Sequence, residues 1–377
     1  MHVLIVPDKF KGTLSAEGAC TAIAQGWRTV RGKDELELLP MSDGGDGFGE
    51  VMARLIQAQS RLVSTCDAAH RSIRAQWWWH PIRKLALIES ARVIGLAMLP
   101  PKKFHPFQLD TFGLGQVFKA AVRRGAQHCV IGIGGSATND AGFGLARALG
   151  WKFLNQQGQS LEQWWQLVQL HRVIPPKARL ALDVTVAVDV QNSLLGKNGC
   201  SPVFGPQKGL TARDVAYAES CLDRLNCVLE RQHGIESARM PGAGAAGGLG
   251  FGLMAFMGAK PQMGFDVFAE AAGLARRIRR SGLVITGEGA LDKQSAMGKG
   301  VGQIARLCQK LKVPCVAFAG AIEAHGFGNL FRETRALTEI TSLPAAKAEP
   351  QRYLRQLASS MAADWSDYAC AHLSIRG

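Results

Sequence analysis

Short apolar runs alternate with amphipathic stretches along most of this chain. The runs have the length and β-branched content of buried strands, and several are followed by apolar positions at the helical spacing. The strand candidates are residues 3–6, 36–40, 61–89 (several short strands), 129–133, 151–155, 180–188, 283–286 and 313–319. The helix candidates are residues 15–27, 48–57, 90–99, 112–124, 141–149, 164–170, 214–234 and 352–373. This alternation of strand and helix is typical of an α/β fold.

The stretch from residue 129 to 150 predicts a strand, a glycine-rich turn and a helix. Apolar residues recur at the helical spacing from Ala141, and Gly150 suits the end of that helix. Backbone N–H groups at a helix N-terminus favour an anion such as phosphate, and glycine permits its close approach. The alternative is an ordinary turn in which Thr138 or Asn139 caps the helix. The candidate ligand-binding residues here are Gly134, Gly135, Ser136, Asn139 and Asp140.

A second glycine cluster spans residues 241–250 and contains a formal G-x-G-x-x-G pattern. No strand leads into it, so a dinucleotide fingerprint is poorly supported. We expect it to open a helix of small residues that runs through Met257, with N–H groups facing a phosphate or a carboxylate. Tight helix packing is the alternative. The candidate binding residues are Gly242, Gly244, Gly247 and Gly248.

Charged residues follow the ends of several predicted strands, where open α/β sheets bind ligands. Asp8 and Lys11 follow the first strand and are candidate ligand-binding residues. An Asx turn with a surface lysine would give the same sequence pattern. Asp43 and Asp46 lie on a glycine turn; they suit Mg²⁺, or they cap the next helix. The run 201–209, rich in proline and glycine, predicts a loop.

Polar and charged residues also follow two further predicted strands. Asp189 follows the strand 180–188, with Asn192 close behind it. Glu288, Asp292 and Lys299 follow the strand 283–286. Carboxylates hold Mg²⁺ and a lysine offsets charge on the transferred group, which is the arrangement that metal-assisted phosphoryl transfer requires.

Composition restricts the class of protein. The 377 residues, with 47% hydrophobic and 20% charged content, match a globular protein of two or three domains. Nine cysteines without paired spacing indicate reduced thiols and a cytoplasmic location, and no apolar run approaches the ~20 residues of a membrane span. The net charge of +14 fits anionic small substrates; nucleic acid is not expected, because the basic cluster 276–280 suits a solvated helix face.

The order and spacing of six segments resemble the bacterial glycerate kinases of type I over nearly the whole chain. Two motifs are highly specific together: Gly-Gly-Ser-Ala-Thr-Asn-Asp at 134–140 and Pro-Gly-Ala-Gly-Ala-Ala-Gly-Gly at 241–248. The six segments are residues 7–12, 43–45, 131–140, 203–209, 241–250 and 285–289. The chain departs from the family pattern at Lys9, Phe112, Gln191, Ser193, Ala290 and Met297.

The resemblance implies ATP-dependent phosphorylation of D-glycerate, usually at its 2-hydroxyl, in glyoxylate and sugar-acid catabolism. It also implies two α/β domains: a flavodoxin-like parallel-sheet domain from residues 1–65 and 280–377, and a second domain, 66–279, inserted in it. The active site is then expected in the interdomain cleft. Glycerate and ATP are the expected small-molecule partners, Mg²⁺ the cofactor, and a monomer or homodimer the expected assembly.

Roles for individual residues follow as hypotheses. Asp189 orients or deprotonates the attacking hydroxyl, and Lys299, with Lys11, offsets charge on the phosphoryl group. Arg71 pairs with the glycerate carboxylate, unless it has only a surface role. The residues that complete the catalytic and metal sets are Asp8, Glu288, Asp292 and Asp43.

Two other classes of protein remain as alternatives. The pattern Gly132-x-Gly134-x-x-Ala137 after a strand suggests an NAD(P)-dependent oxidoreductase of a small hydroxy acid. The acidic residue that such a fold needs about 20 positions on is missing, because residues 148–161 contain no Asp or Glu. A nucleic-acid-binding protein is supported by charge alone.

Overall fold

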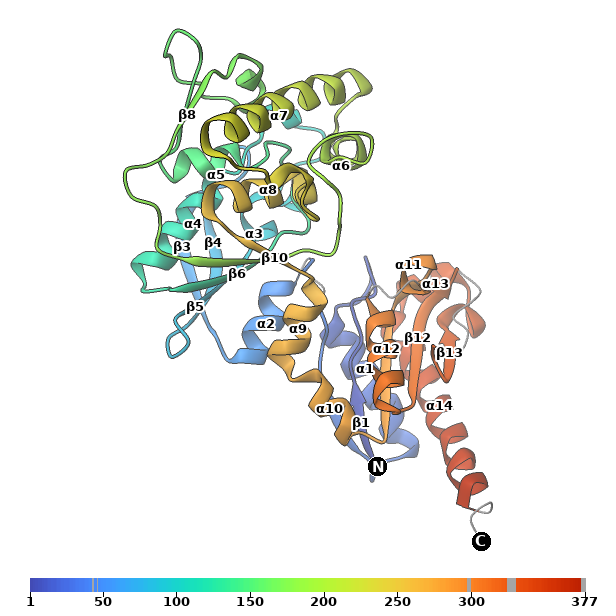
Figure 1. Cartoon of the computed structure of the whole chain (residues 1–377). Helices are drawn as coiled ribbons and strands as arrows, with labels where there is room; N and C mark the ends of the chain where they lie inside the picture. Colours follow the sequence, from blue (N-terminus) through green and yellow to red (C-terminus); the bar gives the residue numbers. More distant parts are fainter. Residues whose placement is uncertain (43, 46, 297–299, 324–329, 374–377) are drawn as a thin grey trace. The chain divides into compact units, whose positions relative to one another are not determined.

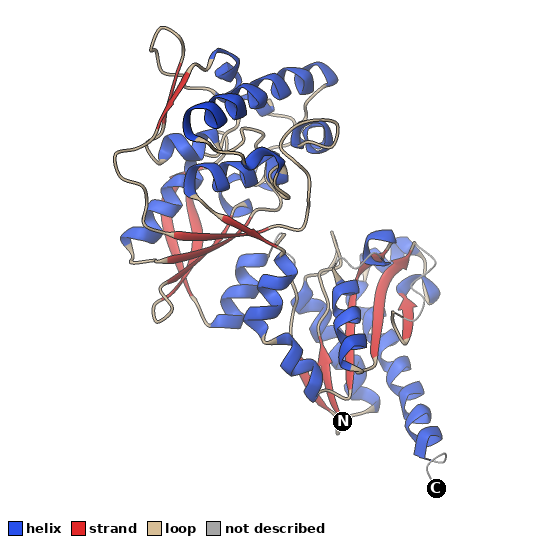
Figure 2. Ribbon diagram, viewed as in Figure 1, coloured by secondary structure: helices blue, strands red, loops and turns tan. Residues whose placement is uncertain are grey.

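The chain divides into two compact units, each with α/β architecture (Figures 1 and 2). The computed structural model describes residues 1–42, 44, 45, 47–296, 300–323 and 330–373, although not the side chains of 294, 296 and 366–373. One unit consists of Met1–Ser42 and Phe268–Gly377, the other of Asp43–Val267. The predicted α/β class is confirmed. The limits of the sequence-based domains, 1–65 with 280–377 and 66–279, stay a prediction.

The unit built from both chain ends contains a parallel sheet. Its described strands lie in the order β13-β12-β11-β1-β2, and every neighbouring pair is parallel. This is the flavodoxin-like order, and the direction of the connections reverses between β1 and β11. The strands are β1 (His2–Ile5), β2 (Glu35–Leu38), β11 (Leu283–Leu291), β12 (Cys315–Ile322) and β13 (Glu333–Ala336).

Helices cover this sheet, and the first of them starts where the sequence predicts. Ser15 caps α1 by accepting from the Gly18 backbone N–H at 3.1 Å. Helix α1 packs closely on α14, since a Cβ on Gly26 would lie 2.1 Å from the Arg355 carbonyl oxygen. The helices are α1 (Ala16–Val30), α10 (Leu274–Arg280), α11 (Lys293–Ala296), α12 (Val301–Leu311), α13 (Leu343–Ala348) and α14 (Pro350–Leu373); α9 (Gly264–Ala272) contains the boundary between the units.

The second unit contains a mixed sheet in the order β10-β9-β6-β5-β4-β3. The first four strands are mutually parallel, and β4 and β3 are added antiparallel. Helices α4 and α8 lie on one face and α2 on the other (Figure 1). The strands are β3 (Gln59–Cys66), β4 (Ser72–His80), β5 (Leu85–Glu89), β6 (His128–Gly132), β9 (Asp183–Ala187) and β10 (Lys260–Gln262), with a separate antiparallel pair β7 (Lys152–Leu154) and β8 (Arg172–Ile174).

The three consecutive tryptophans of β4 are buried. Trp77 and Trp79 lie in the core on one face of the sheet. Trp78 lies on the other face against α2, where a Cβ on Gly49 would come within 2.0 Å of its ring. The alternation follows from the period of two in a β-strand.

One predicted element is wrong. Residues 201–209 form most of helix α6 and its C-terminal cap, not a loop. Cys200, Gly205 and Lys208 are buried where α6 packs on α7 and α8, so tertiary packing overrides the low helix propensity of proline and glycine. The helices of this unit are α2 (Phe48–Ile56), α3 (Ala91–Ile94), α4 (Phe112–Arg123), α5 (Phe143–Ala148), α6 (Cys200–Lys208), α7 (Ala212–His233) and α8 (Ala245–Met257), with short 3₁₀ turns at Leu96–Met98, Pro106–Gln108, Trp164–Gln169 and Ser237–Arg239.

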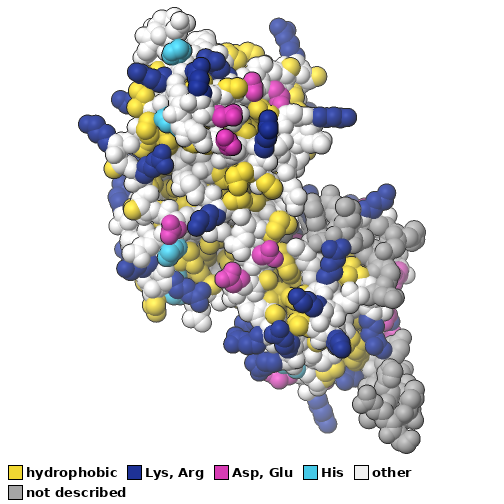
Figure 3. Space-filling view, viewed as in Figure 1, with side chains coloured by type: hydrophobic (Ala, Val, Ile, Leu, Met, Phe, Trp, Pro, Cys, Tyr) yellow, Lys and Arg dark blue, Asp and Glu magenta, His cyan; other side chains and the backbone are white. Residues whose placement is uncertain are grey.

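The structure can be compared with three expectations from composition, which concern the basic residues, the cysteines and membrane-spanning helices. Lys and Arg side chains are dispersed over the visible face (Figure 3), and Arg276, Arg279 and Arg280 of the basic cluster are exposed, as expected for a solvated helix face. The cysteines that the structure describes are free thiols. Within the same residues, no helix has the length and apolar character needed to cross a membrane.

Candidate active site

The glycine loop after β6 carries two backbone donors that have no acceptor among the residues that the structure describes. The loop is anchored at its sides, because Leu96 N–H donates to Gly135 O at 2.9 Å and Ala137 N–H donates to Ile94 O at 2.8 Å. Across the described part of the chain, nothing accepts from the N–H of Gly135 or of Ser136. Adjacent N–H groups of this kind suit the oxygens of a phosphate or a carboxylate.

The second glycine cluster packs directly on this loop. Ala141 N–H donates to Gly247 O at 3.1 Å. A Cβ on Gly247 would lie 1.9 Å from Thr138 O, and its φ of +71° is one that other residues rarely adopt. The two predicted glycine clusters therefore form one backbone-lined region, and glycine at 247 is required for it.

The second cluster does not open a regular helix as predicted. Ala246, Gly247 and Gly248 all have left-handed backbone conformations, so regular α-helical geometry in α8 begins after them. The chain after β9 lies beside this bend, since Gly244 N–H donates to Asn192 O at 2.8 Å. Asn192 is held in turn, because its Nδ2 donates to Asn198 O at 2.7 Å.

Asp189 lies at the same edge of the sheet, just after β9. Its Oδ1 accepts from the N–H of Gly264, the first residue of α9, at 3.0 Å. A carboxylate at a helix N-terminus is stabilised by the helix dipole. Asp189 is therefore fixed in position at the carboxyl end of the parallel strands, as predicted from its place after a buried strand.

The glycine turn at Gly44 and Gly45 lies between the ends of β6 and β9. Gly134 N–H donates to Gly44 O at 3.4 Å, and a Cβ on Gly44 would lie 3.1 Å from Ala187 O. Glu89, buried at the end of β5, holds the chain after this turn by accepting from the N–H groups of Gly47 and Gly49 at 2.9 and 3.1 Å. Sequence reasoning missed Glu89, although an acidic residue directly after the apolar run 85–88 was a signal. Asp43, a predicted metal ligand, lies outside the described residues.

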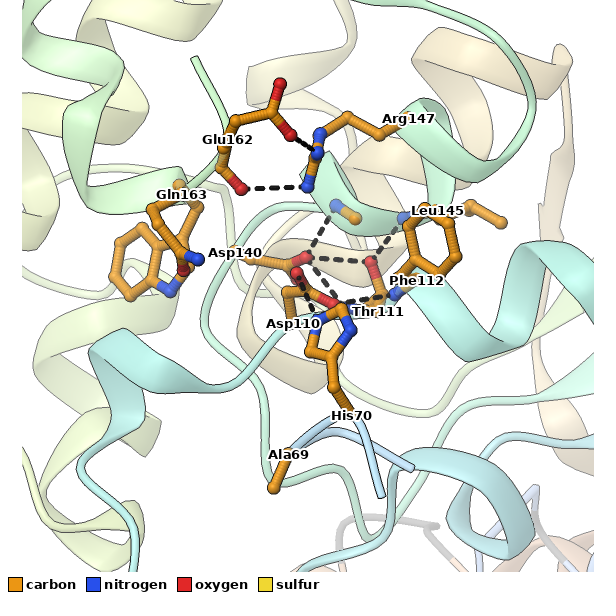
Figure 4. A network of polar contacts seen from close by, with 12 residues as sticks. Ala69, His70, Asp110, Thr111, Phe112, Asp140, Leu145, Arg147, Glu162 and Gln163 are labelled. Atoms are coloured by element: carbon orange, nitrogen blue, oxygen red, sulfur yellow. Dashed lines mark hydrogen bonds and ion pairs between the residues drawn. The ribbon is translucent and has the colours of Figure 1, made fainter. Parts of the chain in front are cut away.

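Asp140 is the centre of a buried network beneath the loop (Figure 4). Its Oδ2 accepts from Thr111 N–H at 2.9 Å, Thr111 Oγ1 at 2.7 Å and Gly144 N–H at 2.9 Å. Burial, together with the charge of Asp110, raises the pKa of Asp140 to about 6, although these hydrogen bonds oppose the rise. Asp140 thus caps the start of α5 by accepting from the N–H of Gly144, a role that the sequence suggested for Thr138 or Asn139. A contact between Asp140 and a ligand stays a prediction.

Lys208 is a buried cation beside the loop that sequence reasoning missed. Its Nζ donates to Thr138 O at 2.6 Å. Burial lowers the pKa of Lys208 to about 8. Nearby, Asn139 Nδ2 donates to Ser201 Oγ at 2.9 Å, whereas Asn139 Oδ1 is buried without a partner in the described structure. The family-like motif at 203–209 was the only signal for Lys208, and the prediction of a loop there concealed it.

Arg71 lies in the hairpin between β3 and β4. Its guanidinium pairs with Asp67 at 2.6 Å through Nε and Nη2, and Nη2 also donates to Met98 O at 3.0 Å. Asp67 is buried, and its Oδ2 is the oxygen that both nitrogens contact, so this ion pair fixes the hairpin. The predicted partner of Arg71, a substrate carboxylate, would compete with Asp67.

In the unit made from both chain ends, predicted residues gather at the carboxyl ends of β1 and β11. Asp8 N–H donates to Gly287 O at 2.8 Å, and Asp8 is almost fully buried. A Cβ on Gly289 would lie 3.0 Å from the backbone nitrogen of Lys11, so the two strand exits run close together. The direction of the connections between strands reverses here, between β1 and β11, and open α/β sheets bind ligands at such a point.

Glu288 and Asp292 share a hydrogen-bonding partner in this region. Ser295 Oγ donates to Glu288 Oε1 at 2.5 Å, and Ser295 N–H donates to Asp292 Oδ1 at 3.1 Å. No three His, Cys, Asp or Glu side chains among the described residues are grouped as metal ligands. Lys299, the predicted cation of this site, lies outside those residues.

Comparisons with known proteins agree with the fold and the motifs. The model of the glycerate kinase family matches residues 3–366. A glycerate kinase from Halalkalibacterium halodurans is 34% identical over 96% of this chain and 97% of its own. The glycerate 2-kinase of Escherichia coli is 34% identical over 92% of this chain and 93% of its own.

A solved structure extends the similarity to three dimensions. The crystal structure of a putative glycerate kinase 2 from Salmonella typhimurium LT2 superposes with a TM-score of 0.84 at 31% identity, covering 98% of this chain and 99% of that one. These matches favour phosphoryl transfer over the oxidoreductase and nucleic-acid alternatives. The resemblance found in the sequence motifs is confirmed. The chain belongs to the glycerate kinase family, and it is a phosphotransferase with an alcohol group as acceptor.

Proposed function

We propose that this protein transfers the γ-phosphoryl group of ATP to the 2-hydroxyl of D-glycerate, forming 2-phosphoglycerate and ADP. The 3-hydroxyl is the alternative acceptor. The observation that supports the proposal is the loop at Gly135 and Ser136, where two adjacent N–H groups beside the second glycine cluster have no acceptor among the described residues. Nucleotide phosphates and the glycerate carboxylate are both anions that such a loop binds.

Asp189 is our candidate for activating the acceptor. In the reaction the glycerate hydroxyl oxygen forms a bond to Pγ, the bond from Pγ to the ADP oxygen breaks, and the hydroxyl proton leaves. Asp189 orients that hydroxyl and accepts its proton. A positioned base of this kind contributes about 10²–10⁴-fold to the rate. Its hydrogen bond from Gly264 N–H gives the carboxylate a fixed direction.

Glu288 and Asp292 suit Mg²⁺, because hard carboxylate oxygens are its preferred protein ligands. Mg²⁺ bound with ATP takes one or two carboxylates and completes its shell with water and phosphate oxygens, so a group of three protein ligands is not needed. Bound there, the ion would offset charge on the β- and γ-phosphates. Asp43 is a further candidate ligand, and Asp8, Lys11 and Lys299 are proposed to act on the phosphoryl group.

The role of Asp189 is tested by Asp189→Asn. Asparagine keeps an oxygen that accepts from Gly264 N–H, so the start of α9 stays capped while the base is lost. We expect kcat to fall at least about 100-fold in a coupled ATP-consumption assay, with ATP binding retained. Asp183→Asn is the control, because Asp183 begins β9, the strand that leads to Asp189, and its side chain is 87% exposed. Near-normal turnover of Asp189→Asn would remove Asp189 from the mechanism.

The product and the acceptor are tested separately. The same assay over glycerate, tartronate and sugar acids measures the substrate preference. Proton-coupled phosphorus NMR distinguishes the products, since a phosphate on C2 couples to one carbon-bound proton and a phosphate on C3 couples to two. We expect D-glycerate to yield the 2-phosphate. We also expect the protein to be a cytoplasmic monomer or homodimer. Absence of ATP turnover with every acid would refute the proposed function.

A further inference from the structure

Strand β3 forms a long, open edge of the six-stranded sheet. It lies at the end of that sheet, and β4 is its one neighbouring strand among the residues that the structure describes. β3 has eight residues, whereas the other edge strands of the two large sheets are short: β2 and β13 have four each and β10 has three. The pairing of β3 with β4 runs without a bulge over all eight residues, and β3 contains no proline or lysine. Shortness, bulges, proline and lysine are the usual features that keep an edge strand from pairing with another chain, and β3 lacks each of them.

The hydrogen bonds of the hairpin show which residues of β3 face the open edge. Asp67 N–H donates to Arg71 O at 2.9 Å, and these two residues form the next pair of the β3–β4 register. Because hydrogen-bonded and non-hydrogen-bonded pairs alternate along an antiparallel ladder, the odd-numbered residues of β3 bond to β4. The even-numbered residues Ser60, Leu62 and Ser64 therefore direct their N–H and C=O groups towards the open edge.

The side chains of Ser60, Leu62 and Ser64 are exposed as well, and Leu62 is 55% exposed. Across the described residues, no backbone group outside β4 bonds to Leu62 or Ser64. Ser60 O accepts from Nη1 of Arg61 at 2.9 Å, which agrees with a carbonyl that faces away from β4. Helix α4 covers the opposite face of β3, where Thr65 is buried. The even-numbered residues thus combine an open backbone edge with an exposed row of side chains.

This row is complementary to itself. When a second copy of β3 runs antiparallel about a twofold axis at Leu62, Leu62 of one copy lies opposite Leu62 of the other. Ser60 then lies opposite Ser64 on both sides of the axis, and Ser60 O accepts from the N–H of Ser64 in place of the Arg61 guanidinium. Each of these pairs exchanges two backbone hydrogen bonds, so the interface gains about six. Leucine opposite leucine and serine opposite serine are also favourable cross-strand pairs.

The charges of the strand and the neighbouring helix select this register. With the axis at Leu62, Arg61 lies opposite Val63, so no like charges meet across the edge. An axis at Arg61 would place two arginines directly opposite each other, which is unfavourable. An axis at Val63 would require the edge groups of Cys66, whose carbonyl oxygen faces α4, since a Cβ on Gly113 would lie 1.8 Å from it. The axis at Leu62 avoids both costs.

We propose that the protein forms a homodimer through β3, in which two copies of the strand pair antiparallel about a twofold axis at Leu62. The two six-stranded sheets then become one continuous sheet. Such an interface uses the same surface on both copies, so association stops at the dimer. The proposal rests on β3 and not on the proposed function, and its tests need no substrate.

Sedimentation equilibrium of the full chain over a range of concentrations tests the dimer, and we expect the wild type to reach twice the mass of the chain. Leu62→Pro removes an N–H that faces the open edge and no bond to β4, so an edge strand tolerates it. It removes about two of the interchain hydrogen bonds, so the dimer dissociation constant should rise about 30-fold. A wild-type chain that stays monomeric, or Leu62→Pro chains that associate as tightly as the wild type, would overturn the proposal.

A second pair of variants separates the interface from net charge. Leu62→Lys should raise the dimer dissociation constant about tenfold or more, because two like charges then lie opposite each other. Ile82→Lys is the matched control, since Ile82 is 89% exposed in the turn between β4 and β5. The same change there should leave the dissociation constant unaltered. Equal weakening of the dimer by both substitutions would contradict an interface at β3.

Leu62→Cys tests the register without weakening the strand. Opposite Cα atoms in a hydrogen-bonded antiparallel pair are about 5.5 Å apart, which is within the range of a disulfide. Mild oxidation should therefore link Leu62→Cys chains into a dimer, seen on a non-reducing gel, about tenfold faster than Ile82→Cys chains. The wild type, with its own free thiols, measures the background. Cross-linking of the two variants at the same rate would overturn the proposal, and this test holds even where Leu62→Pro fails to fold.

Discussion

Lys208 destabilises the fold at neutral pH, and its replacement by methionine measures by how much. The ammonium group is buried beside the glycine loop, where its hydrogen bond to Thr138 O replaces its hydration shell. Methionine has a similar length and no charge. We therefore expect Lys208→Met to be more stable than the wild type at pH 7, while phosphoryl transfer weakens because the loop at Thr138 loses its anchor.

The magnitude follows from the pKa of Lys208, which falls from 10.5 to about 8 on folding. Below pH 8 the amine is charged in both states, and a lysine pKa that is lower by one in the folded state costs about 1.4 kcal/mol, so the folded state is destabilised by about 3 kcal/mol. As the pH rises from about 8 to 10.5, the folded protein releases the proton first and this destabilisation disappears. Loss of the hydrogen bond to Thr138 offsets about 1 kcal/mol of the gain in the variant.

The assay is urea unfolding of both proteins at several pH values. Lys208→Met should exceed the wild type by about 2 kcal/mol in unfolding free energy at pH 7. The difference should fall by about 3 kcal/mol by pH 10.5, so that the variant is then about 1 kcal/mol less stable than the wild type. Lys119→Met, at an exposed position on α4, is the control and should show no such change. A difference between Lys208→Met and wild type that does not vary with pH would refute the argument that the charge is buried at a free-energy cost.

Two further substitutions test the contacts around the loop. Gly247→Ala should lower the unfolding free energy by about 2 kcal/mol or more and abolish most activity, because its Cβ would meet Thr138 O at 1.9 Å. Gly258→Ala, with a similar φ of +68° and nothing within 4 Å, should cost only about 1 kcal/mol, and equal losses would contradict the proposed contact. Thr111→Val should cost about 2–4 kcal/mol in urea unfolding, since it removes a donor to Asp140 and the acceptor of Leu145 N–H; a neutral effect would contradict the network.

Local patterns in the sequence predict the parts of this site that backbone conformation determines. The glycines at 134, 135 and 247 can be predicted because turns and close backbone contacts require them, and Asp189 can be predicted because it follows a buried strand. The role of Lys208 cannot be predicted in this way. Its burial arises from the packing of α6 on α7 and α8, which no local pattern encodes. The capping of α5 by Asp140 is a similar case, since it depends on Thr111, 29 positions away.

The loop that we propose binds an anion is held by two buried charges that each weaken the fold. Asp140 has its pKa raised to about 6, so its contribution to stability is fully present at low pH and is lost as the pH rises through about 6. Lys208 has its pKa lowered to about 8, so stability increases as the pH rises above that value. Between pH values of about 6 and about 8 both groups are charged, and there each of them lowers the stability of the fold most. A packed apolar pair would be more stable. The arrangement is therefore best explained by position: charged groups with directional hydrogen bonds fix Thr138 and the start of α5. They thereby also fix the N–H groups of Gly135 and Ser136, for which the described structure holds no acceptor.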